Sequence, residues 1–239
     1  MPGHATPSPR TPTHLGVVER VLSGTPRPLP GRGSSSLGRT EVDAIDVGPL
    51  GVAGDDFGDR THHGGSEKAL HQYPAEHLLR WREALPDQAA RFLAGAFGEN
   101  LSSRGLDEHG LCIGDTLRIG SATLQVSQGR QPCWKLGAHF GRDDLASLAQ
   151  ASGRLGWYLR TLEPGRIRAA DAIELLARPN PRWSVERVHR AVFERQHTTA
   201  DLLTLAELPG LSPRWRTLFA RRLLPQHEED TTARLTGPP

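Results

Sequence analysis

Sulfur is scarce in this chain: its 239 residues include two cysteines, Cys112 and Cys133, and a single methionine. Two cysteines are too few for a disulfide framework or for a zinc site built from cysteines. The longest apolar runs extend over only a few residues, so no segment is expected to cross a membrane. The first residues lack a charged segment followed by an apolar stretch, which argues against a secretory signal. We therefore expect a cytoplasmic protein with reduced thiols.

An excess of charge of one sign is also absent. The chain has 29 basic and 27 acidic side chains, a formal charge of +2. This balance argues against binding to nucleic acid or to a membrane surface, although a local basic pocket remains compatible with it. No glycine-rich G-x-G-x-x-G segment follows a strand pattern, so neither NAD nor a flavin is expected. A hydrophobic content of 36% is typical of a globular domain.

Short strand patterns separated by turn residues dominate the region 14–179. This pattern is typical of a closed or Greek-key β-barrel with added helices. The proline-rich residues 1–13 predict a disordered leader, and 26–38 predict a mobile loop. Helical spacing predicts helices over 67–85, with a break or kink at Pro74, and over 143–150. The expected strands are 14–22, 41–47, 116–119, 122–126, 157–162, 167–168 and 172–176.

The apolar period becomes helical after Pro179. Three helices are predicted over 184–193, 199–208 and 212–222, the first capped by Ser184. Together they predict a small three-helix C-terminal subdomain over 180–225. The polar residues 226–239 predict a disordered tail.

Cys133 is the strongest candidate for chemistry. Arg130 precedes it by three residues and Lys135 follows it by two, and nearby cations favour an ionised thiol. The alternating residues before it indicate that Cys133 follows a strand end, on a loop that a rigid scaffold presents. A buried, purely structural cysteine is the alternative. Cys112, between Leu111 and Ile113, is expected to be packed and inert.

Five short motifs occur in one order along the chain. They resemble the MOSC family, which is named after the C-terminal domain of molybdenum cofactor sulfurases, and the appended helices resemble its YiiM-like branch. The resemblance covers residues 16–224. The motifs are His63-Gly64-Gly65-x-x-Lys68-Ala69, Tyr73-Pro74-x-Glu76-His77, Phe97-Gly98-Glu99-Asn100-Leu101, Ile113-Gly114-Asp115 and Ser127-Gln128-x-Arg130-Gln131-Pro132-Cys133.

The resemblance implies a mainly β fold with helices: a MOSC-type β-barrel followed by a three-helix subdomain. It implies a molybdenum cofactor of the molybdopterin type, with Cys133 as the ligand to molybdenum. It also implies an oxidoreductase that reduces and so detoxifies small N-hydroxylated compounds, such as hydroxylaminopurine or amidoximes, with electrons from a separate reductase. The oligomeric state stays open between monomer and homodimer.

The chain departs from the family pattern at two places. Gly129 stands where proline is usual, which predicts a looser loop before Cys133. Relatives tend to carry lysines in the segment 31–39, whereas this chain has only Arg32 and Arg39 as cations there.

Several residues are candidates to hold the implied cofactor. Arg39, Lys68 and Arg130 are candidates for its phosphate, because guanidinium and ammonium groups bind phosphate well. Backbone N–H groups at Gly64 and Gly65 could approach an anion closely, although an ordinary tight turn is the alternative. Ser127, which begins the cysteine motif, and Lys135, which follows it, complete the set.

Three polar residues are candidates to orient the site or to move protons. Asn100 is expected to hydrogen-bond the pterin or the substrate, and Glu99 to orient the site or shuttle a proton. A helix cap or an Asx turn is the alternative for this pair. His63 is a candidate proton donor because imidazole titrates near neutral pH, with a bond to loop backbone as the alternative. The remaining histidines lack convincing zinc-ligand spacing, so zinc is not expected.

Two other functions remain open. Cys133 could carry a persulfide or hand an intact cofactor to other enzymes, since the chain has no desulfurase domain of its own. Alternatively, the chain could be a non-enzymatic binding module whose C-terminal helices recruit a partner.

Overall fold

The computed structural model describes residues 12–29, 34–56, 64–225, 229 and 231–237. His63, Arg32 and residues 1–11 of the expected leader lie outside these ranges. The first strand, β1, begins at Thr13, one residue earlier than expected. Within the described ranges, no helix combines the length and the apolarity needed to cross a bilayer.

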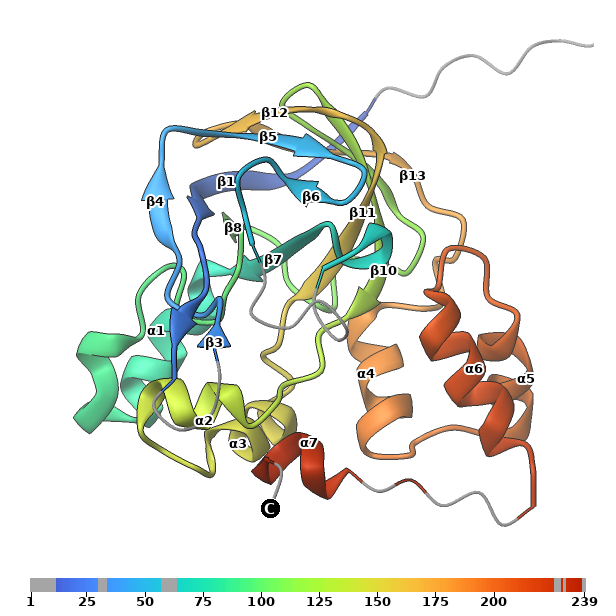
Figure 1. The fold of residues 1–239 in the computed structure, drawn as a ribbon. Coiled ribbons are helices and arrows are strands. Elements are labelled where there is room, and N and C mark those ends of the chain that lie inside the picture. Colours follow the sequence, from blue (N-terminus) through green and yellow to red (C-terminus); the bar gives the residue numbers. More distant parts are fainter. Residues whose placement is uncertain (1–11, 30–33, 57–63, 226–228, 230, 238–239) are drawn as a thin grey trace, which may run out of the picture.

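A seven-stranded β-barrel forms the body of the molecule, as the sequence predicted (Figure 1). The strands follow the order β13-β9-β10-β11-β7-β8-β1, and β13 pairs with β1 to close the barrel, while β4 extends β1 at its end. The strands are β1 (Thr13–Ser23), β4 (Thr40–Val42), β7 (Leu70–Pro74), β8 (Leu101–Arg104), β9 (Thr116–Ile119), β10 (Ala122–Gly129), β11 (Trp157–Glu163) and β13 (Ala172–Ala177).

Two smaller sheets accompany the barrel. β5 (Ala44–Gly48) pairs with β6 (Gly51–Val52) and with β12 (Gly165–Arg168), and β2 (Arg27–Pro28) pairs with β3 (Ser34–Ser35). The strand predicted over 41–47 is therefore two strands, β4 and β5, which belong to different sheets and are separated by a bend at Asp43. The segment 26–38, predicted as a loop, contributes β2 and β3.

The prediction of a helix before Pro74 is wrong. That stretch forms a short 3-10 helix, η1 (Ser66–Lys68), and then the buried strand β7, which runs parallel to β8 and antiparallel to β11. Gln72 is polar but fully paired: it donates to the Ser103 hydroxyl at 2.9 Å and accepts from the Trp157 ring N–H at 3.1 Å. Pro74 caps the start of α1 (Ala75–Ala84), where a missing N–H costs nothing.

The hairpin predicted between 116–119 and 122–126 is confirmed, with Ile119 opposite Ala122 in β9 and β10. Three helical segments cover one end of the barrel: η2 (Pro86–Arg91), α2 (Lys135–Phe140) and α3 (Leu145–Ser152). They enclose a cluster of stacked rings, with Tyr73 and Phe97 4.5 Å apart and Phe92 and Phe140 4.7 Å apart between ring centroids.

The three C-terminal helices are also confirmed: α4 (Val185–Phe193), α5 (Thr199–Ala206) and α6 (Pro213–Arg222). The Ser184 hydroxyl accepts from the Arg187 N–H at 3.1 Å, as a capping serine should. Trp215 and Phe219 of α6 belong to the same buried cluster as Leu124 and Val126 of the barrel. The helices therefore pack on the barrel through a shared core.

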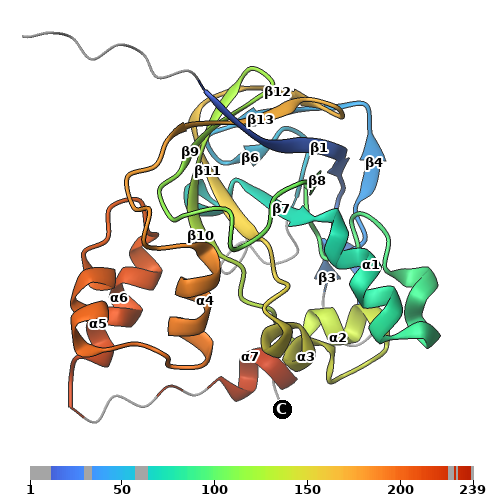
Figure 2. The ribbon, with the colours of Figure 1, turned by 180° about the vertical axis from the view of Figure 1, so that it is seen from behind.

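The end of the chain differs from its prediction as a disordered tail. Residues 232–236 form a short helix, α7 (Thr232–Thr236), which contacts α3 (Figure 2). The Arg234 carbonyl accepts a hydrogen bond from the Trp134 N–H at 2.8 Å. This long-range contact, which the local sequence does not encode, brings α7 against the turn that carries Cys133.

Candidate functional site

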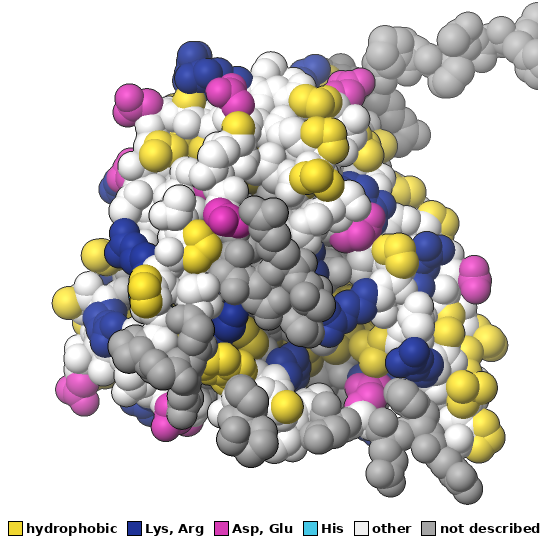
Figure 3. Space-filling model, in the orientation of Figure 1, with side chains coloured by type: hydrophobic (Ala, Val, Ile, Leu, Met, Phe, Trp, Pro, Cys, Tyr) yellow, Lys and Arg dark blue, Asp and Glu magenta, His cyan; other side chains and the backbone are white. Residues whose placement is uncertain are grey.

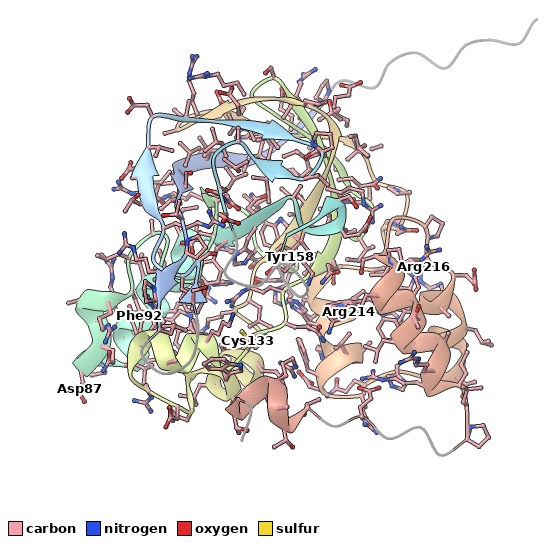
Figure 4. The ribbon with its side chains drawn as sticks, in the orientation of Figure 1. Asp87, Phe92, Cys133, Tyr158, Arg214 and Arg216 are labelled. Atoms are coloured by element: carbon pink, nitrogen blue, oxygen red, sulfur yellow. The ribbon has the colours of Figure 1, made fainter. Side chains whose placement is uncertain are left out.

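Cys133 follows the end of strand β10, where the chain leaves the barrel. The Arg130 N–H donates to the Gly156 carbonyl at 3.1 Å, and the Cys133 carbonyl accepts from Leu136 in α2 at 2.9 Å. The thiol is therefore presented by a loop fixed at both ends. Cys133 is partly exposed and lies below Tyr158 in Figure 4, whereas Cys112 is buried. The predicted contrast between the two cysteines is confirmed.

A cavity opens beside the Cys133 thiol. Four cationic residues line it, Arg39, Lys68, Arg130 and Lys135, and no acidic residue does so among the described ones. Figure 3 shows several Lys and Arg side chains on the lower half of the molecule, in the orientation of Figure 1. A concave site with cations and no acid attracts anions.

Arg130 is a buried cation with one unsatisfied donor atom. It is 5% exposed, and its guanidinium lies 5.9 Å from the Phe97 ring centroid. Its Nη1 atom has no hydrogen-bond partner within the described residues. An unpaired charged donor costs several kcal/mol when buried, so Arg130 is placed as if for an anion in the cavity.

Arg39 also lines the cavity, but its charge is compensated. Its guanidinium forms a buried ion pair with Asp55, and its Nε donates to the Gly98 carbonyl at 3.1 Å. Asp55 also accepts from the Asn100 side-chain amide at 2.7 Å. Asn100 in turn accepts from the His71 N–H at 3.2 Å. Arg39 and Asn100 therefore tie the strand ends together while they form part of the cavity wall.

His71 was missed as a site residue. It lines the cavity on strand β7, and its Nε2 lies 3.2 Å from the Leu155 carbonyl, so this nitrogen carries the proton. Burial, and then the charge of Arg130, lower its pKa well below the usual value. The imidazole is thus neutral. Its position two residues before Tyr73, in the second motif, was the available signal.

The rings of Phe97 and Tyr158 complete the wall. Tyr158 lies partly buried in strand β11, and its side chain lines the cavity. Burial raises the pKa of Tyr158, although the charge of Arg130 opposes the increase. The Tyr158 hydroxyl therefore keeps its proton at neutral pH. The Lys68 ammonium lies 5.6 Å from the Tyr158 ring centroid.

Three predicted residues lie near the cavity but do not line it. Both carboxylate oxygens of Glu99 accept backbone N–H groups, from Gly95 at 2.6 Å and from Phe97 at 3.0 Å. The Ser127 hydroxyl donates to the Glu67 carbonyl at 2.5 Å. Gly65 is exposed outside the wall, while Gly64 lines it with a φ of 78° that favours glycine. Glu99 and Ser127 thus support neighbouring backbone.

The presence of glycine at position 129 has a steric explanation. A Cβ atom added there would lie 1.9 Å from Nε2 of His189, a buried residue of α4. Gly129 itself lies within β10, opposite Trp157. The expected looser loop is therefore not what the glycine produces. It instead allows a side chain of the helical subdomain to pack directly on the strand that leads to Cys133.

Two family models match this chain, one over the barrel and one over the three C-terminal helices. A family model described as the MOSC domain matches residues 59–174, and one described as the YiiM-like, 3-alpha helix domain matches 183–224. Protein YiiM of Escherichia coli (strain K12) is 36% identical over 218 residues, which are 91% of this chain and 97% of that protein. The chain belongs to the MOSC family and carries the YiiM-like three-helix domain.

Solved structures agree with this assignment. The crystal structure of YiiM from Escherichia coli superposes with a TM-score of 0.77 and 33% identity, covering 94% of this chain and 98% of that one. YiiM from Geobacillus stearothermophilus gives a TM-score of 0.74 and 31% identity, covering 87% and 100%. A protein named Reductase from Gibberella moniliformis is 34% identical over 198 residues, 81% of this chain but only 35% of its own length.

Proposed function

We propose that this chain binds a molybdenum cofactor of the molybdopterin type beside Cys133 and reduces small N-hydroxylated compounds there. The observation that carries the proposal is the unpartnered Nη1 of buried Arg130, in a cavity with four cations, no acid among its described residues, and a partly exposed thiol. This donor set fits the cofactor: a thiolate suits molybdenum, and the cations suit a phosphate.

The residues divide into two groups by what they would hold. Cys133 would ligate the metal through its sulfur. Arg130, Lys68 and Lys135 would bind the phosphate, and Gly64 would allow the backbone to approach the pterin closely. Arg39, whose charge Asp55 compensates, would contribute mainly by holding the backbone at Gly98 in the cavity wall.

Reduction of R–NHOH to R–NH2 and water consumes two electrons and two protons. When bound, the cofactor supplies the two-electron chemistry, and we propose that a separate reductase provides the electrons. The wall offers a proton at the Tyr158 hydroxyl, which burial keeps protonated by raising its pKa. The His71 proton is engaged with the Leu155 carbonyl, and the Glu99 carboxylate is occupied by backbone N–H groups. His63, the other proposed acid, lies outside the described residues.

Metal and pterin analysis of protein from a host that makes the cofactor tests the proposal. We expect near one molybdenum and one pterin per chain in the parent protein. Cys133→Ala should lose the metal, whereas Cys112→Ala, the matched control, should retain it. Equal metal content in the two variants would contradict the assignment of Cys133. Turnover of an amidoxime or of hydroxylaminopurine with a chemical reductant then tests the reaction itself.

The same preparations distinguish the carrier function. A protein that carries sulfur would show a mass increase of one sulfur atom on Cys133 and no turnover of N-hydroxylated compounds. A protein that binds no pterin under these conditions would favour a non-enzymatic binding module.

A further inference from the structure

The C-terminal segment 231–237 holds the two peptide groups that flank Cys133. The carbonyl of Arg234 accepts from the Trp134 N–H at 2.8 Å, directly after the cysteine. The guanidinium Nη1 of the same residue donates to the Pro132 carbonyl at 2.5 Å, directly before it. One residue thus fixes the backbone on both sides of the thiol.

Arg234 is in turn anchored to other elements. Its Nη2 donates to the Gln150 side chain of α3 at 2.7 Å, and its guanidinium lies 5.8 Å from the Phe193 ring centroid of α4. Gly237 packs against Trp134: a Cβ at this glycine would lie 3.3 Å from the indole ring. The segment therefore joins the Cys133 turn to α3 and to the helical subdomain.

The charge of Arg234 is also close enough to act on the sulfur. Burial lowers the pKa of Arg234, while the Cys133 thiolate opposes this decrease. A guanidinium stays protonated at any physiological pH. The positive charge near the cysteine therefore comes from a residue distant in sequence, in addition to Arg130 and Lys135.

We propose that Arg234 is the positioning residue of Cys133, and that residues 231–237 form a strap that fixes the thiol in the cavity. Only the role of the positioned thiol in catalysis rests on the proposed function. The position and accessibility of the thiol are properties of the cofactor-free chain and can be measured without any activity.

The test compares Arg234→Met, Arg234→Lys and a control, Arg221→Met, at an exposed arginine of α6. The full-length chain is produced in a host that cannot make the cofactor and is treated with a neutral maleimide. The pH is held at about 9.5, one unit above the ordinary thiol value, so that loss of the Arg234 charge does not change ionisation strongly. Mass spectrometry of the two cysteine peptides gives separate rates for Cys133 and Cys112.

We expect Cys133 in Arg234→Met to react about tenfold faster than in the parent chain, because two hydrogen bonds from a charged donor are lost. Arg234→Lys should give an intermediate rate, since one ammonium can reach the Pro132 carbonyl or Gln150 but not both. Cys112 should stay protected in every variant, and Arg221→Met should match the parent.

Two results would overturn the proposal. One is an unchanged Cys133 rate in Arg234→Met, and the other is an equal increase at Cys112, which would mean general loosening of the fold. The outcome is separate from that of the metal analysis. A chain that binds no molybdenum could still show the faster Cys133 reaction in Arg234→Met, and a chain that binds molybdenum could show no change in that rate.

Discussion

Two arginines of the cavity show how residues of one type acquire different roles. Arg39 has Asp55 as its counter-ion, whereas Nη1 of Arg130 has no partner in the described part of the chain. The sequence suggested both as phosphate ligands, because it shows cations but not the acids that neutralise them. Arg130 is therefore better placed than Arg39 to meet an anion, whereas Arg39 is already paired within the fold.

At residue scale, the contact between Gly129 and His189 gives a double-mutant prediction. Gly129→Ala should destabilise the fold by about 1–3 kcal/mol, because the new Cβ collides with the imidazole. In a His189→Ala background the collision is removed, so the same substitution should cost much less. Urea unfolding of the parent, both single variants and the double variant measures the coupling. Additive effects would show that the two positions do not interact.

At the scale of elements, the loop before β8 depends on one buried carboxylate. Glu99 accepts the N–H groups of Gly95 and Phe97, and burial raises its pKa although these bonds oppose the increase. Phe97 and Gly98 of this loop line the cavity. Glu99 therefore shapes the site through backbone that it holds.

Glu99→Ala should free this loop. We expect the amides of Gly95 and Phe97 to exchange hydrogen at least about tenfold faster, since each loses a bond to a charged acceptor. Hydrogen exchange read by NMR measures the change. Glu83→Ala, at an exposed position of α1, is the control and should leave both amides as they are. Unaltered exchange in Glu99→Ala would show that the loop is held by other contacts.

Elements with local signals were predictable, and those held by distant partners were not. The caps at Ser184 and Ser212 and the helical spacing between them identified α4 to α6. β7 was taken for a helix because its polar His71 and Gln72 hide a buried strand, whose partners come from β8 and β11. α7 was missed because its stability comes from contacts across the molecule.

The candidate site follows the same division. The motifs identified Cys133, Lys68 and Arg130, and spacing from the cysteine identified Lys135; all four meet at one cavity. They could not show that both carboxylate oxygens of Glu99 accept hydrogen bonds from backbone N–H groups. Nor could they show that His71 enters the wall from a strand that local spacing assigns to a helix.

At the scale of the whole molecule, the barrel and the three helices form one core. Val188, Trp215 and Phe219 belong to the same buried cluster as the barrel residues Leu124 and Val126. The junction also encloses His189, whose two ring nitrogens have no hydrogen-bond partner within the described residues. Burial lowers the pKa of His189 to about 4, although the charge of Glu108 opposes the decrease.

This buried imidazole predicts a loss of stability in mild acid. The unfolded chain binds a proton at His189 near pH 6.5, whereas the folded chain does so only near pH 4. Stability from this residue is therefore full above pH 6.5 and is lost as the pH falls toward 4, by roughly 3 kcal/mol at most. His189→Leu should flatten this part of the curve of unfolding free energy against pH. The pKa of His71 is also lowered, so His71 adds the same direction of pH dependence to the parent and to His189→Leu. If the two curves of unfolding free energy against pH run parallel, the role of His189 is contradicted.

The placement of the last described residues has a practical consequence for purification. Gly237 lies on the Trp134 ring, next to the partly exposed Cys133. An affinity tag fused to the C-terminal end would begin within a few residues of the cavity mouth, and a polyhistidine sequence there would bring competing metal ligands to it. Thr13, by contrast, pairs with Leu175 at the end of the barrel away from α7 (Figure 1), which makes the N-terminal side the better choice for a tag.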